Sequence, residues 1–342
     1  MTTLRFGIIG SGMIARVIAK AVQQAPSAQL VAVASRREES ARVFAWEHDI
    51  PSVHADWQAL VQADDIDVVY VATPTAGREE ICLAVLDNDK HLISEKPFIS
   101  ADSARRIAAR AQAKGLAFMD ATHFTHHPRT AEVQSRQDKL VGKAQRVNTS
   151  FFFPFMDRSN IRFDPVKEPT GAIGDMAWYS MRAIVEYLRP SGEVLNVHAA
   201  VRRDPETGAF VGGSGLVVFA SSQTSSFDFG YDAGVCQMDL DILGDSGLIQ
   251  IDDYVLDWKD GFAFDNPKYM NRYTLRQGMA SPDEFQHIDV ATEQPQAVHL
   301  VEHFCTLVRE PQGSARESAI RRAIDTQTLL DRYCQAVGLN VE

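Results

Sequence analysis

The sequence predicts an α/β protein in which a doubly wound parallel sheet is followed by an α+β region with an open, mostly antiparallel sheet. Three observations lead to this prediction. The chain has 342 residues, which exceeds the usual size of one hydrophobic core. Apolar runs alternate with helical patterns up to residue 122, whereas later strand candidates follow one another closely and alternate polar with apolar residues. We therefore expect two domains, residues 1–122 and residues 123–342.

The first region consists of apolar strand candidates separated by helical patterns. Strands that are apolar along their whole length are typical of parallel sheets covered by helices on both faces. The strand candidates are Leu4–Gly10, Gln29–Ser35, Asp67–Thr73, His91–Pro97 and Leu116–Thr122, and the helical patterns lie near 12–25, 38–48, 78–88 and 101–114. This order predicts a sheet that binds its ligand at the carboxyl ends of its strands.

The second region starts with a helix and continues with closely spaced strands. Stretches such as SSFDFGYD alternate polar with apolar residues, as expected for an antiparallel sheet that lays one face on a core. The helical pattern lies near 174–189, the strand candidates are Val194–Arg203, Gly215–Ala220, Gln223–Phe229, Cys236–Leu243 and Leu248–Ile251, and helical patterns near 294–309 and 315–337 follow.

One face of this open sheet carries Phe227, Phe229 and Tyr231 at alternating positions. An apolar sheet face needs a cover, which is either a second subunit or helices of the same chain. We expect a homodimer, or a dimer of dimers, formed through this sheet. The alternative is that the terminal helices cover these residues.

Composition limits the partners. The formal net charge of -11 disfavours a nucleic acid or an acidic membrane, since both require a basic surface. No apolar stretch approaches the length of a membrane span, and residues 1–7 contain no charged leader, so we expect a cytoplasmic protein without a membrane partner. Cys82, Cys236, Cys305 and Cys334 lie far apart without metal-binding spacing, and we expect no metal.

The stretch RFGIIGSGMIARV contains a Gly-x-Gly-x-x-Ala pattern between the first strand candidate and the first helix. Gly10 allows a tight turn, Gly12 lets a pyrophosphate approach the backbone, and Ala15 lets the helix pack closely. The alternative is a plain glycine-rich turn. We expect a dinucleotide to bind at Gly10, Ser11, Gly12, Met13 and Ile14.

The end of the second strand candidate indicates which dinucleotide binds. Chains that bind NAD carry an acid about 20 residues after the glycines. This chain instead has Ser35, Arg36 and Arg37, and a hydroxyl followed by guanidinium groups suits the 2′-phosphate of NADP. We therefore favour NADP over NAD. The alternative is that the arginines form a solvated helix start.

Two further strand candidates end where ligands bind in such sheets. One ends in Thr73-Pro74 and the next in Glu95-Lys96-Pro97. Pro97 keeps Lys96 out of helical geometry, and an ammonium group at this edge can bind a substrate oxygen or transfer a proton. The alternative is a solvated surface lysine. We expect cofactor contacts from Thr73, Pro74, Glu95 and Lys96.

The stretch GAIGDMAWYS carries an acid and a phenol four residues apart. On a helix, Asp175 and Tyr179 lie one turn apart on the same face and can act on one ligand. The alternative is an ordinary helix start, in which the acid suits the helix dipole and the ring packs. We expect Trp178, on a different face, to pack.

Together these stretches resemble the glucose–fructose oxidoreductase / inositol dehydrogenase / MocA-type (Gfo/Idh/MocA) family. The resemblance spans nearly the whole chain, from the glycine pattern through Glu95-Lys96-Pro97 to NIRFDP and GAIGDMAWY. It implies that Lys96 is catalytic or substrate-binding and that Asp175 and Tyr179 form a second catalytic block. The tyrosine resembles the branch of the dimeric dihydrodiol dehydrogenases and NADP-linked aldose dehydrogenases.

The resemblance implies an NADP-dependent enzyme that transfers a hydride between nicotinamide and a carbinol or carbonyl carbon of a sugar, polyol or cyclic diol. Tyr179 would be the general acid and base, and Lys96 would bind the same oxygen and favour the ionised phenol. Alternatively, Lys96 carries the proton itself. Asp175 would hold a substrate hydroxyl or position the other two. Two other functions stay open, an NAD-linked reductase of a keto-sugar or nucleotide sugar and a non-catalytic NADP-responsive sensor.

The sequence departs from the family pattern where the substrate is expected. After Thr-Pro, family members commonly have Asn-x-x-His, whereas this chain has Thr75-Ala-Gly-Arg78, and we expect Arg78 to be a surface helix residue. Family members commonly have large apolar residues where this chain has Thr122 and His123, and the resemblance implies that these positions lie near the substrate mouth. They are candidate substrate contacts, as is Arg162, for which we favour a structural role.

Overall fold

A computed structural model describes residues 3–155, 157–261, 263–311 and 313–340. The chain divides into two compact units. The first unit contains residues 1–122 and 297–324, and the second contains residues 123–296 and 325–342. This division differs from the expected domains of 1–122 and 123–342, because residues 297–324 return to the first unit.

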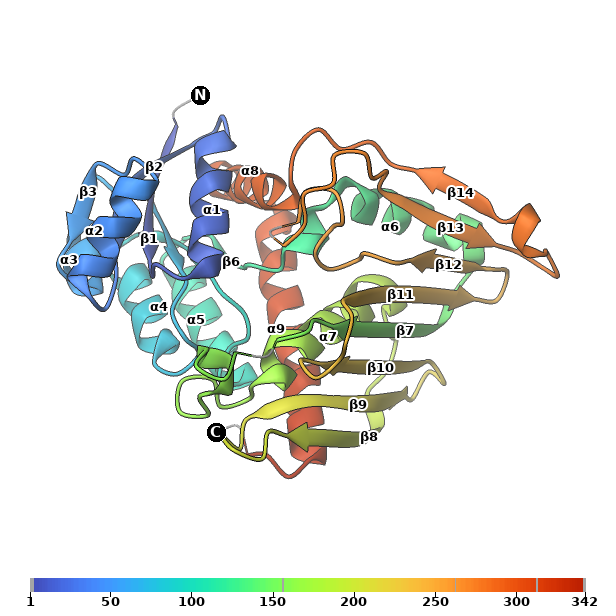
Figure 1. The fold of residues 1–342 in the computed structure, drawn as a ribbon. Helices are drawn as coiled ribbons and strands as arrows, with labels where there is room; N and C mark the ends of the chain where they lie inside the picture. Colours follow the sequence, from blue (N-terminus) through green and yellow to red (C-terminus); the bar gives the residue numbers. More distant parts are fainter. Residues whose placement is uncertain (1–2, 156, 262, 312, 341–342) are drawn as a thin grey trace. The chain divides into compact units, whose positions relative to one another are not determined.

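The first unit holds a sheet of six strands in the order β3-β2-β1-β4-β5-β6 (Figure 1). Every neighbouring pair in this sheet is parallel, as the sequence predicts for this region. The strand order reverses between β1 and β4, and ligands of such sheets bind at this switch point beyond the carboxyl ends of the strands. In chain order the elements are β1 (Leu4–Ile9), α1 (Met13–Gln24), β2 (Ala28–Ala34), α2 (Glu38–Glu47), β3 (Ser52–His54), α3 (Trp57–Gln62), β4 (Val68–Val71), α4 (Arg78–Asp87), β5 (His91–Ser94), α5 (Ala101–Ala113) and β6 (Phe118–Asp120).

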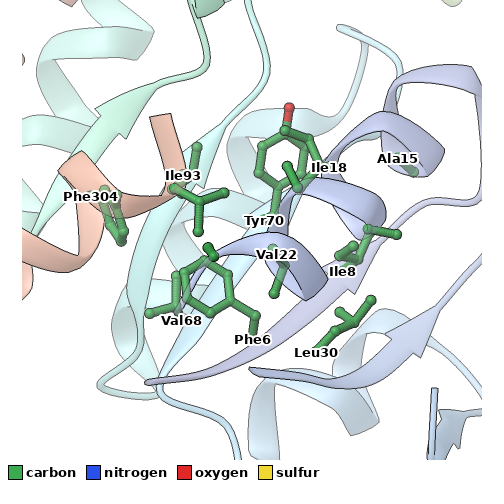
Figure 2. Packing of buried hydrophobic residues seen from close by; sticks show 14 of the residues in the cluster. Phe6, Ile8, Ala15, Ile18, Val22, Leu30, Val68, Tyr70, Ile93 and Phe304 are labelled. Carbon is green, nitrogen blue, oxygen red and sulfur yellow. The ribbon is translucent and has the colours of Figure 1, made fainter. Parts of the chain in front are cut away.

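The core on one face of this sheet is closed by a helix from near the end of the chain. Helix α8 (Gln296–Arg309) places Val298, Val301 and Phe304 in the same buried cluster as the strands and helices α1 and α2. Figure 2 shows Phe304 beside Phe6 and Ile93 of the sheet. Residues that are far apart in the sequence therefore complete one hydrophobic core.

The second unit holds an eight-stranded sheet in the order β14-β13-β12-β11-β7-β10-β9-β8 (Figure 1). Neighbouring strands are antiparallel except β7 and β10, so the sheet is mostly antiparallel, as predicted. Its strands are β7 (Ala144–Phe152), β8 (Val194–Arg203), β9 (Phe210–Phe219), β10 (Thr224–Gly230), β11 (Gln237–Gly244), β12 (Leu248–Ile251), β13 (Arg272–Arg276) and β14 (Gln286–Asp289). The helical segments are η1 (His123–His126), α6 (Pro128–Val141), η2 (Ile161–Phe163), η3 (Ile173–Ala177), α7 (Trp178–Ala183), η4 (Ile184–Leu188), η5 (Pro282–Glu284) and the last part of α9 (Ser314–Ala336).

The apolar residues singled out on this sheet face helices of the same chain. Phe227, Phe229 and Tyr231 are all buried, and the first two rings pack against Tyr333 of α9. The opposite face of β10 carries the polar residues Ser226 and Asp228. The reason given for a dimer was therefore wrong, because alternation along β10 turns its aromatic residues inward.

No helix among the described residues is long and apolar enough to cross a membrane.

Candidate active site

The glycine-rich turn between β1 and α1 has the geometry of a phosphate-binding loop. Gly10 has φ = 120°, and a Cβ atom there would lie 2.7 Å from the carbonyl oxygen of Ala72, so only glycine fits without strain. At Gly12 an added Cβ would meet no atom within 4 Å, so the space beside this backbone is open. Gly12 caps α1 without a side-chain hydrogen bond, and the first turn of the helix contains no acid. The first amides of α1, starting at Met13 and Ile14, thus suit an anion.

The loop after β2 lies next to this turn. The hydroxyl oxygens of Ser11 and Ser35 are 3.0 Å apart and share a hydrogen bond, which connects the two loops. Arg36 and Arg37 are exposed, and neither guanidinium forms an ion pair within the described part of the chain. Two cationic groups therefore stand beside the glycine-rich turn, where they can bind a phosphate.

The loop after β4 contains a buried hydroxyl that needs a partner. Thr73 Oγ1 is shielded from solvent and makes no hydrogen bond to any residue that the structure describes. A buried hydroxyl of this kind is costly unless a ligand or water pairs with it. Thr73 and Pro74 lie at the switch point between β1 and β4, so a cofactor is the partner that this position suits.

Arg78 is buried, and the prediction of a surface residue was wrong. Its Nη1 atom donates to the carbonyl oxygens of Glu95 at 2.8 Å and Pro97 at 2.6 Å. Its Nε atom donates to the carbonyl oxygen of Thr73 at 2.9 Å. One side chain at the start of α4 therefore connects the loops that follow β4 and β5.

The loop after β5 presents Lys96, whose side chain is half-buried. The preceding residue, Glu95, is buried, and its carboxyl accepts hydrogen bonds from the hydroxyl of Tyr70 and from the Lys96 backbone amide. Figure 2 shows the Tyr70 hydroxyl pointing away from the apolar cluster around its ring. Burial raises the pKa of the Glu95 carboxyl, while the nearby charges of Lys96 and Arg78 partly offset this effect.

The end of β6 carries a further pair of polar side chains. Thr122 is fully buried and its hydroxyl donates to the Asp120 carboxylate. His123, which is also buried, begins the short helix η1 of the second unit. Thr122 and His123 are thus neighbours in the chain that belong to different units.

The second unit carries Asp175 and Tyr179 on one continuous helical segment. It consists of π-helical turns at 173–177 and 184–188 around the α-helical turns of α7, and such π turns are frequent at functional sites. From Gly171 to Ile184 every residue is buried except Asp175 and Tyr179, which are half-buried. Both predicted residues therefore reach the surface of this segment, and Trp178 packs inside as predicted.

The turn before this helical segment requires a glycine at position 171. Gly171 has φ = 47°, and a Cβ atom there would lie 2.5 Å from the carbonyl oxygen of Phe210. Glycine thus allows the chain to pass close to β9 before the helical segment starts. The Tyr179 ring is positioned by Phe151, whose ring centroid lies 5.4 Å away in an edge-to-face arrangement.

Asp175 is held by two donors within its own unit. Arg162 Nε lies 2.6 Å from Asp175 Oδ2, and the hydroxyl of Tyr231 donates to the same oxygen at 2.9 Å. The Asp175 charge raises the pKa of the Arg162 guanidinium. Burial, followed by the Asp175 charge, raises the pKa of Tyr231, so this phenol stays protonated and keeps donating.

The structure brings the candidate residues together in two groups. Lys96 and the proposed cofactor contacts lie along the carboxyl edge of the first sheet, whereas Arg162, Asp175 and Tyr179 belong to the second unit. Sequence reasoning missed two residues of these groups, Tyr231 and the buried Arg78. Tyr231 continues the inward alternation of Phe227 and Phe229, and that alternation was the available signal.

The chain is similar to known oxidoreductases. Residues 4–122 match the sequence profile of GFO_IDH_MocA, described as "Oxidoreductase family, NAD-binding Rossmann fold". The chain is 30% identical over 232 residues to the dTDP-3,4-didehydro-2,6-dideoxy-alpha-D-glucose 3-reductase of Actinomadura kijaniata, covering 67% of this chain and 69% of that protein. It is 24% identical over 350 residues, 98% of both chains, to the scyllo-inositol 2-dehydrogenase (NADP(+)) IolU of Bacillus subtilis.

A solved structure has the same fold over nearly the whole length. KijD10, a 3-ketoreductase from Actinomadura kijaniata in complex with NADP and TDP-benzene, matches with a TM-score of 0.85 and 23% sequence identity. The match covers 98% of both chains. The α/β fold with a parallel first sheet and a mostly antiparallel second sheet is therefore that of known proteins.

Proposed function

This chain belongs to the GFO_IDH_MocA oxidoreductase family, and on that premise we propose that it transfers a hydride between NADP(H) and a carbinol or carbonyl carbon of a sugar-like substrate. The protein is an enzyme with an NAD(P)-binding Rossmann domain. The observation that carries the proposal is the position of Lys96 at the carboxyl end of β5. This end lies on the sheet edge that also carries the glycine-rich turn.

The residues of the first unit fit a phosphorylated dinucleotide. The open space at Gly12, the start of α1 without a side-chain cap and the unpaired Thr73 hydroxyl suit a pyrophosphate and its neighbouring groups. Arg36 and Arg37 suit the 2′-phosphate, which supports NADP over NAD. When bound, the nicotinamide supplies or takes up the hydride. The protein residues hold it and move the proton.

The proton is assigned to the phenol of Tyr179, with Lys96 bound to the same substrate oxygen. A neighbouring ammonium group stabilises a phenolate or an alkoxide, so the pair favours removal of the hydroxyl proton during oxidation. In the reverse direction Tyr179 returns the proton to the carbonyl oxygen. Asp175, fixed through Oδ2 by Arg162 and Tyr231, is assigned to a substrate hydroxyl.

The test is a substrate panel with NADP and NAD in both directions. The panel contains aldoses, inositols, cyclic diols and keto-sugars, and it is repeated with Lys96→Ala. We expect turnover of at least one sugar-like compound with NADP, and a loss of about 10²- to 10⁴-fold in Lys96→Ala. Equal turnover by Lys96→Ala would remove Lys96 from the mechanism, whereas full activity with NAD alone would overturn the cofactor assignment.

A second candidate is reduction of a nucleotide-linked keto-sugar. It is favoured by the 30% identity to the dTDP-sugar 3-reductase of Actinomadura kijaniata. The panel therefore includes a dTDP-keto-sugar beside the free keto-sugar. A kcat/KM at least tenfold higher for the nucleotide-linked compound selects this candidate, because a site for a nucleotide sugar makes contacts with the nucleotide that the free keto-sugar lacks.

A cytoplasmic location and a homodimer through the sheet of the second unit remain predictions. A dimer on this sheet would bury its polar face, which carries Asn148, Ser226 and Asp241. Sedimentation at micromolar concentration measures the oligomeric state, and a monomer would refute the prediction.

A further inference from the structure

Arg78 is a buried arginine whose described hydrogen bonds reach main-chain carbonyl groups on both sides of Lys96. Its Nη1 atom contacts the carbonyl oxygen of Glu95 at 2.8 Å and that of Pro97 at 2.6 Å. These are the residues directly before and after Lys96. The backbone that carries the lysine is thus held on both sides by one nitrogen atom.

The same guanidinium is anchored on the neighbouring strand. Nε and Nη2 donate to the carbonyl oxygen of Thr73 at 2.9 Å and 2.5 Å. Nη2 also lies 3.5 Å from the Thr75 hydroxyl, a weaker contact. Arg78 therefore fixes the Lys96 loop relative to the loop assigned to the cofactor.

An arginine at position 78 indicates a specific role, because burying its charge is unfavourable unless its hydrogen bonds compensate for the lost water. Arg78 is 5% exposed, and a guanidinium stays charged under all ordinary conditions. Its positive charge favours the ionised form of the buried Glu95 carboxyl, which also accepts from the Lys96 amide. The donors of a guanidinium are spread over three nitrogens in one plane and here reach the carbonyl groups of Thr73, Glu95 and Pro97, whereas the three donors of a lysine ammonium share one nitrogen and cannot match that spacing.

We propose that Arg78 is a positioning residue that fixes the direction of Lys96 through the carbonyl groups of Glu95 and Pro97. This inference rests on the proposed function, because it assigns Arg78 a role through Lys96. Arg78 does not touch the substrate. It keeps the lysine where its ammonium group meets the reacting oxygen.

The test is a double-mutant cycle between Arg78 and Lys96. A displacement of about 1 Å at a reacting group can lower turnover by about 10²-fold, so we expect Arg78→Lys to lower kcat by about 10- to 100-fold. In a Lys96→Ala background the same change should cost less than about twofold, because the residue that Arg78 positions is gone. A purely structural role would give the same loss in both backgrounds and would overturn the inference.

To correct for misfolded protein, kcat is normalised to the fraction of protein that binds NADPH, which fluorescence titration measures. Arg78→Gln provides a second variant that keeps a donor but removes the charge, and the same non-additivity is expected. Arg106→Lys is the matched control, because this exposed arginine pairs with Glu79, the residue after Arg78, and should leave kcat unchanged.

The outcome separates the inference from the proposed function. If Lys96→Ala is inactive while Arg78→Lys and Arg78→Gln keep full normalised kcat, only the positioning role falls. If Lys96→Ala is fully active, both the proposed function and the positioning role of Arg78 are overturned.

Discussion

The candidate residues fall into two halves, one in each unit, that are held in place by different chemistry. In the first unit, Arg78 fixes Lys96 through main-chain carbonyl groups. In the second unit, Arg162 and Tyr231 fix Asp175 through its carboxylate side chain. A carbonyl group is present whatever the residue, whereas the second arrangement needs an acid, a guanidinium and a phenol together. We infer that the second half tolerates fewer substitutions than the first.

The largest effect is expected for Tyr179→Phe, which removes only the hydroxyl from the second half. Loss of a general acid and base lowers kcat/KM by about 10²- to 10⁴-fold. The NADPH dissociation constant should stay unchanged, because the proposed cofactor contacts belong to the first unit. Steady-state kinetics and fluorescence titration measure both quantities.

The control is Tyr269→Phe, since this phenol binds Asp252 and lies outside the candidate site. It should keep full turnover. Near-full turnover by Tyr179→Phe would remove the phenol from the mechanism and weaken the comparison of the two halves.

A smaller loss is expected for Arg162→Met, which leaves Asp175 Oδ2 with Tyr231 as its described donor. We expect kcat to fall by about 10- to 100-fold because the carboxylate loses its orientation. The free energy of unfolding should fall by about 1–3 kcal/mol, since a partly buried charge loses its partner. Kinetics and urea unfolding measure the two effects.

Arg158→Met is the matched control, because Arg158 forms a similar ion pair with Asp204 in the same unit. It should lower stability without lowering kcat. If Arg162→Met behaves in the same way, the Arg162 pair is only structural.

Acid should lower the stability of the two units over different pH ranges. Burial lowers the pKa of His91 to about 4, and its Nδ1 atom accepts a hydrogen bond from the Ala117 amide at 3.0 Å. The unfolded chain binds this proton near pH 6.5, so the first unit loses stability as the pH falls from 6.5 towards 4. In the second unit burial acts to raise the pKa of Asp204, but hydrogen bonds from Arg158 and Thr207 outweigh it and lower this pKa to about 2. The contribution of Asp204 to stability is therefore lost only as the pH falls below about 4.

Hydrogen exchange of each unit at pH 7 and pH 4.5 measures this difference. The first unit should lose on the order of 2 kcal/mol from His91. His91→Asn keeps an acceptor for the Ala117 amide and should remove most of this loss. An unchanged pH dependence in this variant would contradict the assignment.

The smallest effect is expected for Arg36→Ala. Loss of one charge-assisted bond to the 2′-phosphate should raise the NADPH dissociation constant about tenfold and leave that of NADH unchanged. Arg42→Ala is the control, because Arg42 is exposed and pairs with Glu38. An equal increase in the dissociation constants of NADPH and NADH would show that Arg36 does not bind the 2′-phosphate.

Local patterns predicted most of the fold. The strand β4 is buried at every position, and its unbroken apolar run, VVYV, is visible in the sequence. The strands β3 and β14 were missed because they are short and carry no buried side chain. The central strand β7 was missed because its buried positions include Ala144 and the polar Thr149, so AQRVNTSFF shows only a weak alternation of polar and apolar residues.

The site was predictable where its chemistry is local. Gly10, Gly12 and Lys96 lie in short motifs whose backbone geometry follows from the neighbouring residues. Arg78 was not predictable, because its partners are the carbonyl groups of residues up to 19 positions away, which leave no mark on the sequence. Tyr231 lies 56 positions from Asp175, so only the packed second unit brings them together.

The return of residues 297–324 to the first unit has a consequence for synthesis on the ribosome. A chain emerges from its N-terminus, and domains that are continuous in sequence can fold as soon as they are released. Here Val298, Val301 and Phe304 reach the first core only after the whole second sheet has been made. Until α8 has been made, one apolar face of the first sheet therefore stays incompletely covered. A fragment ending at residue 122 would expose the same surface.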